Sequence, residues 1–305
     1  MQVLVLAVHP SVVINKKILR EDLHICKKCC TFAQNMQFIG IIPARYASTR
    51  FPGKPLADLC GKPMIQYVYE QAKKVLDTVI VATDDQRIYD CVHHFGGVAY
   101  MTSPNHRCGT DRICEAYEKL KGENGKLKTD DEVVVVNIQG DEPFIQPEQI
   151  QAVMDCFPTD IATLAKPYTA SDSLEELQTP NVVKVVFSPI THEALYFSRS
   201  MIPYLRGVEP NEWLGKCQYY SHIGLYAYRA DVLKRITQLP VSSLEQAESL
   251  EQLRWLENGL TIKVAISETK SIGIDTPEDL QHAIKHFQNK QQKNTRTCRC
   301  FYFAF

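Results

Sequence analysis

Three basic side chains lie close together in the segment Pro43-Ala44-Arg45-Tyr46-Ala47-Ser48-Thr49-Arg50-Phe51-Pro52-Gly53-Lys54-Pro55-Leu56. Arginine presents a planar fork of donors and lysine a compact charge, and both suit phosphate oxygens. We therefore predict that Arg45, Arg50 and Lys54 bind the phosphates of a nucleotide; the alternative is a solvated basic loop. Neither a G-x-G-x-x-G fingerprint nor a Walker sequence is present, which argues against a dinucleotide cofactor and a P-loop.

Two distant carboxylates are candidate ligands for a divalent cation. Asp141 lies in Asn137-Ile138-Gln139-Gly140-Asp141-Glu142-Pro143, and Asp275 lies in Gly273-Ile274-Asp275-Thr276-Pro277. Mg²⁺ takes carboxylate and triphosphate oxygens together, so both residues are predicted metal ligands. The alternatives stay open: Asp141 belongs to a turn or caps the next helix, and Asp275 caps a helix. Sequence separation alone does not show that the two carboxylates meet.

A third candidate site lies in His106-Arg107-Cys108-Gly109-Thr110-Asp111-Arg112. Gly109 permits close backbone approach, and Thr110 offers a hydroxyl at a helix start. These two residues are predicted to hold the base or ribose of a nucleotide. An ordinary helix start explains the same residues equally well.

Polar residues in the second half are candidates for binding an acidic sugar. Arg199 is suited to a carboxylate, and His222 and Tyr226 are suited to hydroxyl groups. The alternative for His222 is a buried histidine whose hydrogen bonds are satisfied within the core, and the alternative for Tyr226 is an ordinary aromatic residue of a strand. Glu251-Gln252 faces either the same pocket or solvent.

These segments follow the predicted strands of an alternating pattern. Buried strands are predicted at 38–42, 78–82, 98–101 and 132–138, and helices at 63–75, 85–95 and 111–120. Alternating strands and helices predict an α/β fold with a mainly parallel sheet and helices on both faces. Ligands of such sheets sit at the carboxyl ends of the strands. The second half is less regular, with strands predicted at 182–187 and 223–228, a loop at 200–218, and helices at 247–257 and 276–287.

Composition excludes several classes of protein. The 305 residues include 45% hydrophobic and 23% charged side chains, which is typical of a globular protein. The net charge of −1 argues against nucleic-acid binding. No stretch reaches the ~20 apolar residues of a membrane-spanning helix. Basic residues follow the apolar start of the chain, whereas in a secretory signal they precede it, so a cytoplasmic protein is expected.

The cysteines and the two ends stand outside this pattern. Six of the 11 cysteines are scattered through the body, as expected for reduced structural thiols: Cys60, Cys91, Cys108, Cys114, Cys156 and Cys217. Cys26-x-x-Cys29 has the spacing of half a zinc site, but the far end lacks a matching set, so no metal is expected there. Residues 1–35 and 288–305 are unexplained, being either disordered or products of a misplaced start and a shifted reading frame.

Taken in order, six segments resemble the 3-deoxy-manno-octulosonate cytidylyltransferases, also called CMP-Kdo synthetases. The resemblance spans about Phe38 to Phe287, and its segments are Pro43-Ala44-Arg45-x-x-Ser48-x-Arg50-x-Pro52-x-Lys54-x-Leu56, Gln139-Gly140-Asp141-Glu142-Pro143, Tyr196-Phe197-Ser198-Arg199, His222-Ile223-Gly224-x-Tyr226-x-Tyr228-Arg229, Leu250-Glu251-Gln252-Leu253-Arg254 and Gly273-Ile274-Asp275-Thr276-Pro277-Glu278-Asp279.

The resemblance implies a Rossmann-like nucleotidyltransferase fold over residues 36–287, with a smaller sugar-binding and dimerisation lobe. It implies a homodimer that uses CTP, Mg²⁺ and 3-deoxy-D-manno-octulosonate (Kdo) for lipopolysaccharide synthesis. It assigns Arg45 and Lys54 to the triphosphate and Asp141 and Asp275 to Mg²⁺. It assigns binding of the sugar acid to Gln139, Arg199, His222, Tyr226 and Gln252. One departure is Cys108, where the family usually has serine.

The expected reaction is an in-line attack of the Kdo anomeric hydroxyl on the α-phosphorus of CTP, with pyrophosphate as the leaving group. Arg45, Lys54 and Asp141 are the residues predicted to carry it. A related alternative is CMP activation of a sialic- or legionaminic-type sugar acid. A non-catalytic nucleotide-binding protein is a further alternative, but no metal carboxylate or phosphate cation is missing.

Overall fold

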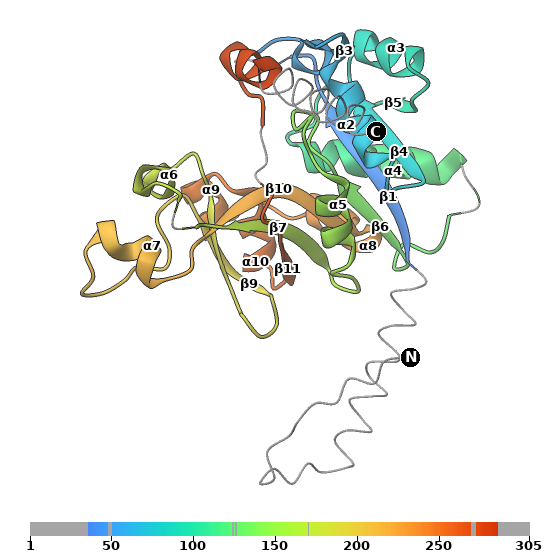
Figure 1. The fold of residues 1–305 in the computed structure, drawn as a ribbon. Helices are drawn as coiled ribbons and strands as arrows, with labels where there is room; N and C mark the ends of the chain where they lie inside the picture. The colour runs from blue at the N-terminus through green and yellow to red at the C-terminus, as the bar shows by residue number, and fades with distance from the viewer. Residues whose placement is uncertain are drawn as a thin grey trace, which may run out of the picture. The chain divides into compact units, whose positions relative to one another are not determined.

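The architecture comes from a computed structural model, which describes residues 36–47, 51–123, 125, 127–169, 171–269 and 273–285 (Figure 1). The chain divides into two units after Met36, and the fold below is that of the second unit. Several predictions concern residues outside this described part of the chain: those on the two unexplained ends, on the Cys26-x-x-Cys29 pair and on Arg50.

The first half alternates strands and helices as predicted. Its main elements are β1 (Gln37–Ala44), α2 (Met64–Ala72), β4 (Thr78–Thr83), α3 (Gln86–His94), β5 (Ala99–Met101), α4 (Gly109–Glu123) and β6 (Val133–Asn137). A 3₁₀ turn η1 (Lys54–Leu56) and a small hairpin of β2 (Asp58–Leu59) and β3 (Lys62–Pro63) connect β1 to α2. Each predicted strand and helix of this half is confirmed, within a few residues at its ends.

The second half adds strands of mixed direction. Its elements are α5 (Pro147–Met154), β7 (Ile161–Pro167), α6 (Leu174–Gln178), β8 (Lys184–Phe187), β9 (Ala194–Ser198), η2 (Pro210–Glu212), α7 (Trp213–Lys216), β10 (Tyr220–Arg229), α8 (Ala230–Thr237), α9 (Ser243–Glu248), α10 (Glu251–Glu257) and β11 (Ile262–Ile266). The expected loop at 200–218 contains η2 and α7, and residues 277–285 are helical.

The central sheet has the strand order β11-β7-β10-β6-β1-β4-β5. All its pairings are parallel except those of β10, which runs antiparallel between β6 and β7. The chain therefore moves outward from β1 through β4 to β5 and then returns to β6 on the other side of β1. Ligands of such sheets bind where the strand order reverses, at the carboxyl ends of the strands.

Helices cover both faces of the sheet, as predicted. Crossovers between parallel strands are right-handed. Successive strands are added in one direction from β1 to β5 and in the opposite direction from β5 to β6, so α4, which connects β5 to β6, lies on the face opposite α2. Contacts agree with this: α4 packs with α8 against β6, while α2 packs with α5. The fold is thus a mainly parallel α/β sheet with a smaller lobe, in which β8 pairs with β9 and with β10.

Burial explains why these segments form strands. Every residue of β6, Val-Val-Val-Val-Asn, is buried, as expected for a strand covered on both faces. The main core gathers side chains from β1, β6, β10 and α10, including Trp255 at 1% exposure. The six scattered cysteines are free thiols, as predicted.

The single helix predicted at 247–257 is wrong. The structure has two helices there, because Ser249 adopts a left-handed backbone conformation (φ 52°) that ends α9. A new helix, α10, then begins after Leu250. The break turns Glu251 and Gln252 into the first turn of a helix that is separate from α9.

Candidate active site

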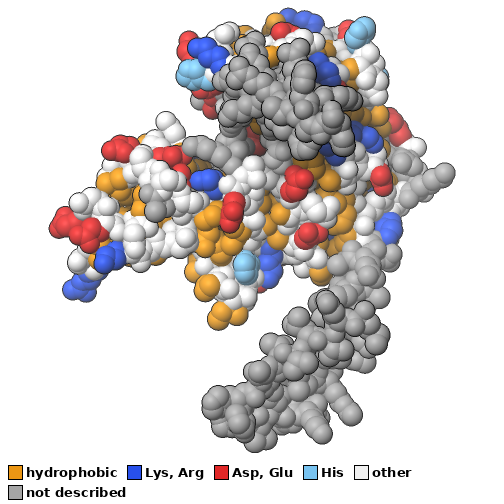
Figure 2. Space-filling model, viewed as in Figure 1, with side chains coloured by type: hydrophobic (Ala, Val, Ile, Leu, Met, Phe, Trp, Pro, Cys, Tyr) orange, Lys and Arg blue, Asp and Glu red, His pale blue; other side chains and the backbone are white. Residues whose placement is uncertain are grey.

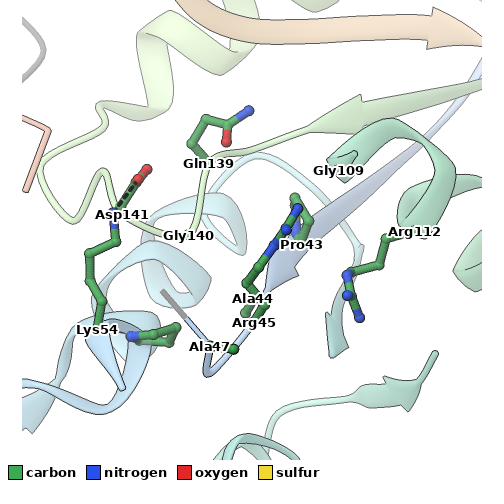
Figure 3. Close-up of a pocket in the computed structure, with 11 residues that line it drawn as sticks. Pro43, Ala44, Arg45, Ala47, Lys54, Gly109, Arg112, Gln139, Gly140 and Asp141 are labelled. Atoms are coloured by element: carbon green, nitrogen blue, oxygen red, sulfur yellow. Dashed lines mark hydrogen bonds and ion pairs between the residues drawn. The ribbon is translucent and has the colours of Figure 1, made fainter. Parts of the chain in front are cut away.

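A cavity of about 430 Å³ opens where β1 and β6 end (Figure 3). The lining residues come from the loop after β1, the loop after β6 and the start of α4: Pro43, Ala44, Arg45, Ala47, Lys54, Pro55, Gly109, Arg112, Gln139, Gly140 and Asp141. Five of the predicted site residues therefore share this cavity: Arg45, Lys54, Gly109, Gln139 and Asp141. In Figure 3, Arg45 lies between the Lys54–Asp141 pair and Arg112.

The two predicted metal carboxylates meet at Lys54. Lys54 Nζ lies 2.7 Å from Asp141 Oδ2 and 3.2 Å from Asp275 Oδ1. A backbone hydrogen bond from Ile274 N to the Asp141 carbonyl oxygen (3.0 Å) holds the two segments side by side. Asp275 also lies just before the cap of the 277–285 helix, where Asp279 accepts from the backbone nitrogens of Asp275 and Thr276. Thr276 Oγ1 accepts from Asp279 N in turn, so Thr276 and Asp279 cap this helix, and the Asp275 carboxylate contacts Lys54.

A glycine allows the two strand ends to approach each other. A Cβ atom at Gly140 would lie 3.0 Å from the Pro43 carbonyl oxygen, tighter than most side chains accept. The main chain after β6 therefore passes directly over the end of β1, which brings Asp141 to the loop that carries Arg45 and Lys54.

A backbone hydrogen bond closes the neck of the loop that carries Lys54. Gly53 N donates to the Tyr46 carbonyl oxygen (2.9 Å), and Gly53 takes a left-handed conformation (φ 70°). The Tyr46 ring lies under the Arg87 guanidinium, 3.3 Å from its central carbon, and Asp85 holds that guanidinium through two hydrogen bonds. The start of α3 thus fixes the position of the loop that carries Lys54.

Gly53→Ala is expected to destabilise the fold by about 1–2 kcal/mol and to weaken CTP binding. The new methyl would meet the Tyr46 ring at 3.1 Å and push apart the neck of the loop. Gly61→Ala is the matched control, because Gly61 also has a positive φ (92°) but no atom within 4 Å of its Cβ position. Urea unfolding should give similar losses for both variants, whereas CTP titration should separate them. Equal CTP affinities would contradict this role for Gly53.

The start of α4 presents main chain, and not the predicted hydroxyl, to the cavity. Gly109 lines the cavity, whereas Thr110 is 3% exposed and its hydroxyl donates to Glu251 Oε2 (2.8 Å). The Cys108 thiol points the same way, with Sγ 3.2 Å from Glu251 Oε1. Burial, with the Glu251 charge beside it, raises the pKa of Cys108 to about 12, and burial also raises the pKa of Glu251. The Cys108 thiol, just before α4, thus contacts Glu251 at the start of α10.

Arg112 was not among the predicted site residues, yet it lines the cavity. Its guanidinium is almost fully buried, donating to Asp84 Oδ2 at 2.7 Å and to Thr102 Oγ1 at 2.6 Å. The ends of β4 and β5 are thereby tied to α4. Its position three residues after Gly109, on the same helix face, is the only signal in the sequence that pointed to it.

A second cavity of about 240 Å³ contains His222. Gln139 connects the two cavities, because it lines the first and its amide nitrogen donates to the carbonyl oxygen of Gly224, which lines the second (3.2 Å). Lys166 also lines the second cavity and forms a long ion pair with Asp172 (3.5 Å). No sequence pattern had singled out Lys166.

His222 is held neutral by its surroundings. Its ring lies against Phe197 and Tyr226, and Nε2 is 2.9 Å from Thr163 Oγ1. Burial lowers the pKa of His222 to about 3. The Thr163 hydroxyl donates to the Leu225 carbonyl oxygen (2.9 Å), so Nε2 must be the histidine donor, which leaves Nδ1 as an acceptor.

His222 is expected to make the protein less stable as the pH falls. Between about pH 6.5 and 3 the unfolded chain binds a proton at this position and the folded chain does not, so the unfolding free energy decreases by up to ~1.4 kcal/mol per pH unit. His222→Gln should flatten the pH dependence of urea unfolding over this range. His94→Gln, which changes an exposed histidine of α3, is the control. An unchanged slope in His222→Gln would show that the ring is protonated in the folded protein.

The other predicted sugar ligands have different surroundings. The Tyr226 hydroxyl is buried without a hydrogen-bond partner in the described part of the chain; the Thr163 hydroxyl, close enough to influence its pKa, already bonds His222 and Leu225. Gln252 is buried at 5% exposure. Arg199 donates from its three guanidinium nitrogens to the carbonyl oxygens of Glu248, Pro180 and Ser249. The roles of these residues in binding a sugar stay predictions.

Comparisons with known proteins agree with this geometry. The family model described as cytidylyltransferase matches residues 39–264. A 3-deoxy-manno-octulosonate cytidylyltransferase of Parabacteroides distasonis is 62% identical over 259 residues, which cover 84% of this chain and all of the relative. One of Phocaeicola vulgatus is 62% identical over 252 residues, covering 81% of this chain and 96% of the relative.

A solved structure extends the likeness to three dimensions. It is a CMP:2-keto-3-deoxy-manno-octonic acid synthetase complexed with CTP, with a TM-score of 0.73 and 41% identity, covering 83% of this chain and 99% of that one. The family model, the relatives and the fold agree, and the chain belongs to the 3-deoxy-manno-octulosonate cytidylyltransferase family.

Proposed function

We propose that this protein transfers CMP from CTP to the anomeric hydroxyl of Kdo, giving CMP-Kdo and pyrophosphate for lipopolysaccharide synthesis. The observation that carries the proposal is the convergence of Lys54, Asp141 and Asp275 at the carboxyl ends of β1 and β6. The CTP complex of a 41% identical relative supports the choice of nucleotide. The names of the curated relatives support the choice of sugar acid.

The donor set fits Mg²⁺. Two carboxylates, Asp141 and Asp275, lie within reach of one ammonium group, so their oxygens can approach one cation. No cluster of three or more His, Cys, Asp or Glu side chains suitable for a metal occurs among the described residues. Two carboxylates are what Mg²⁺ usually takes from a protein, because substrate phosphates and water complete its shell. When bound, Mg²⁺ would neutralise charge on the reacting phosphate and lower the pKa of the attacking hydroxyl.

The nucleotide half of the site stabilises negative charge. Arg45 is exposed at the cavity and makes no hydrogen bond or ion pair with the described residues, so its guanidinium is available to phosphate oxygens. The start of the 15-residue helix α4 adds main-chain donors at Gly109. Arg45 and Lys54 would stabilise the pyrophosphate as the bond to the α-phosphorus breaks.

The sugar half offers neutral hydrogen-bonding groups. His222 presents an acceptor nitrogen, Tyr226 a buried hydroxyl that needs a partner, and Gln139 an amide between the two cavities. We propose that these groups bind sugar hydroxyls, together with Gln252 and Arg199. Carbonyl oxygens already engage the Arg199 guanidinium, so its contribution requires rearrangement or a position at the edge of the pocket.

Pyrophosphate release is the decisive assay. Release should require CTP, Mg²⁺ and Kdo together and should stop when any one is omitted. A sialic- or legionaminic-type sugar acid in place of Kdo tests the alternative substrate. Kdo-independent nucleotide binding without release would instead identify a binding protein.

We also propose that the chain acts as a homodimer in the cytoplasm. Support for an interface comes from large hydrophobic side chains exposed on the smaller lobe, among them Ile190 (90%), Leu195 (65%) and Tyr204 (74%). Figure 2 shows hydrophobic surface at the tip of the β8–β9 hairpin. No helix in the described residues is long and apolar enough to cross a bilayer. Light scattering of wild type and Leu195→Asp should show a dimer that the variant weakens.

A further inference from the structure

Lys54 holds both carboxylates that are suited to the cation. Its ammonium donates to Asp141 Oδ2 and to Asp275 Oδ1, and its side chain is only 14% exposed. Asp141 and Asp275 are more open, at 33% and 49%. Lys54 and Asp141 both line the cavity, and the ammonium is the more buried partner in each ion pair.

An ammonium and a divalent cation compete for these oxygens. Mg²⁺ binds carboxylate oxygen at 2.0–2.1 Å, far closer than a hydrogen bond, and prefers full negative charge on its ligands. With Lys54 in contact, one of the two negative charges is already neutralised and a cation at the same oxygens meets a like charge nearby. The carboxylate pair alone is thus a weak cation site.

A nucleoside triphosphate removes this conflict. Its phosphates supply oxygens for the cation and negative charge for Lys54 at the same time. The Lys54 ammonium can follow them without backbone movement, since it ends a flexible four-carbon side chain. The Lys54 backbone itself stays anchored, with Lys54 N bonded to the Phe51 carbonyl oxygen and Gly53 N to that of Tyr46.

We infer that Lys54 makes cation binding depend on nucleotide: it occupies the Asp141–Asp275 pair until a triphosphate draws it away. The inference rests on the proposed function for the identity of the nucleotide. It assigns Lys54 a second role besides stabilising pyrophosphate, namely preventing the site from filling with cation before CTP arrives. The expected behaviour is that the cation binds weakly by itself and more tightly once CTP is bound.

Mn²⁺ titration followed by electron paramagnetic resonance tests this on the full chain without any turnover. In the absence of nucleotide, Lys54→Met should bind Mn²⁺ about tenfold more tightly than wild type, because the competing charge is gone. Lys62→Met, which removes a lysine paired with Glu70 outside the cavity, should match wild type. With CTP present, the advantage of Lys54→Met should disappear.

Two further results would overturn the inference. One is equal Mn²⁺ affinity of wild type and Lys54→Met without nucleotide, provided thermal unfolding shows that the variant is folded. The other is a gain in Lys54→Met that survives in the double variant with Asp141→Asn, because the added site would then lie elsewhere. Failure of the proposed function appears differently, as absence of pyrophosphate release from wild type with CTP, Mg²⁺ and Kdo.

Discussion

Asp141→Asn is expected to lower kcat by at least ~10³-fold, equivalent to about 4 kcal/mol of barrier, while CTP still binds. Asparagine keeps the shape of the side chain but removes the charge that the reacting phosphate and its cation require. Nucleotide binding should survive because Arg45, Lys54 and the start of α4 line the same cavity. Pyrophosphate release gives kcat, and calorimetric titration gives CTP affinity.

Asp90→Asn is the matched control for this experiment. Asp90 lies on the exposed surface of α3, where it accepts a hydrogen bond from Gln86. Its loss should leave kcat unchanged. Near-normal turnover in Asp141→Asn would refute the assignment of Asp141 to the reaction, whatever the control shows.

Arg112→Met should give the largest loss of stability, about 3–5 kcal/mol in urea unfolding. The substitution leaves Asp84 with an unpaired charge at 16% exposure and removes the hydrogen bond to Thr102. Adding Asp84→Asn should recover part of the loss, because the neutral amide no longer needs a cation. Removing one partner of a buried pair costs more than removing both.

Arg107→Met is the control for Arg112→Met. Arg107 lies just before α4 and pairs with Asp111 in the first turn of that helix, but its side chain is 57% exposed. Exposed pairs contribute ~0–1 kcal/mol, so the variant should unfold almost like wild type. Equal losses for Arg107→Met and Arg112→Met would show that the Arg112–Asp84 pair is not a buried structural tie.

The sequence predicts well which residues after β1 and β6 line the first cavity, for a physical reason. Buried parallel strands read as short apolar runs, and the residues that follow them must lie at one edge of the sheet. Arg45 after β1 and Asp141 after β6 are found in this way. That Asp275 joins them depends on the hydrogen bond between Ile274 and Asp141, across more than a hundred residues, which no local pattern encodes.

The surroundings of the proposed sugar ligands are less predictable because they arise from tertiary contacts. Nothing in the sequence around Arg199 indicates that three carbonyl oxygens accept hydrogen bonds from its guanidinium. The spacing of apolar residues predicts one helix at 247–257, but the left-handed backbone conformation of Ser249 interrupts it. Lys166 lies near the end of β7, a strand that the sequence analysis did not predict. Its position beside His222 follows from the pairing of β7 with β10.

The position of β10 has a consequence for how the protein is made. β10 pairs with β6, and the Asn137 side chain of β6 donates to the Tyr228 hydroxyl of β10, which lies 91 positions later in the chain. During synthesis, β1, β4, β5 and β6 can assemble as soon as they emerge, yet β6 keeps an open edge until β10 has been translated. An open strand edge is a site for wrong pairing between chains. An incomplete sheet therefore emerges from the ribosome and stays exposed at β6 until β10 has been made. A chain truncated before Tyr220 should therefore aggregate.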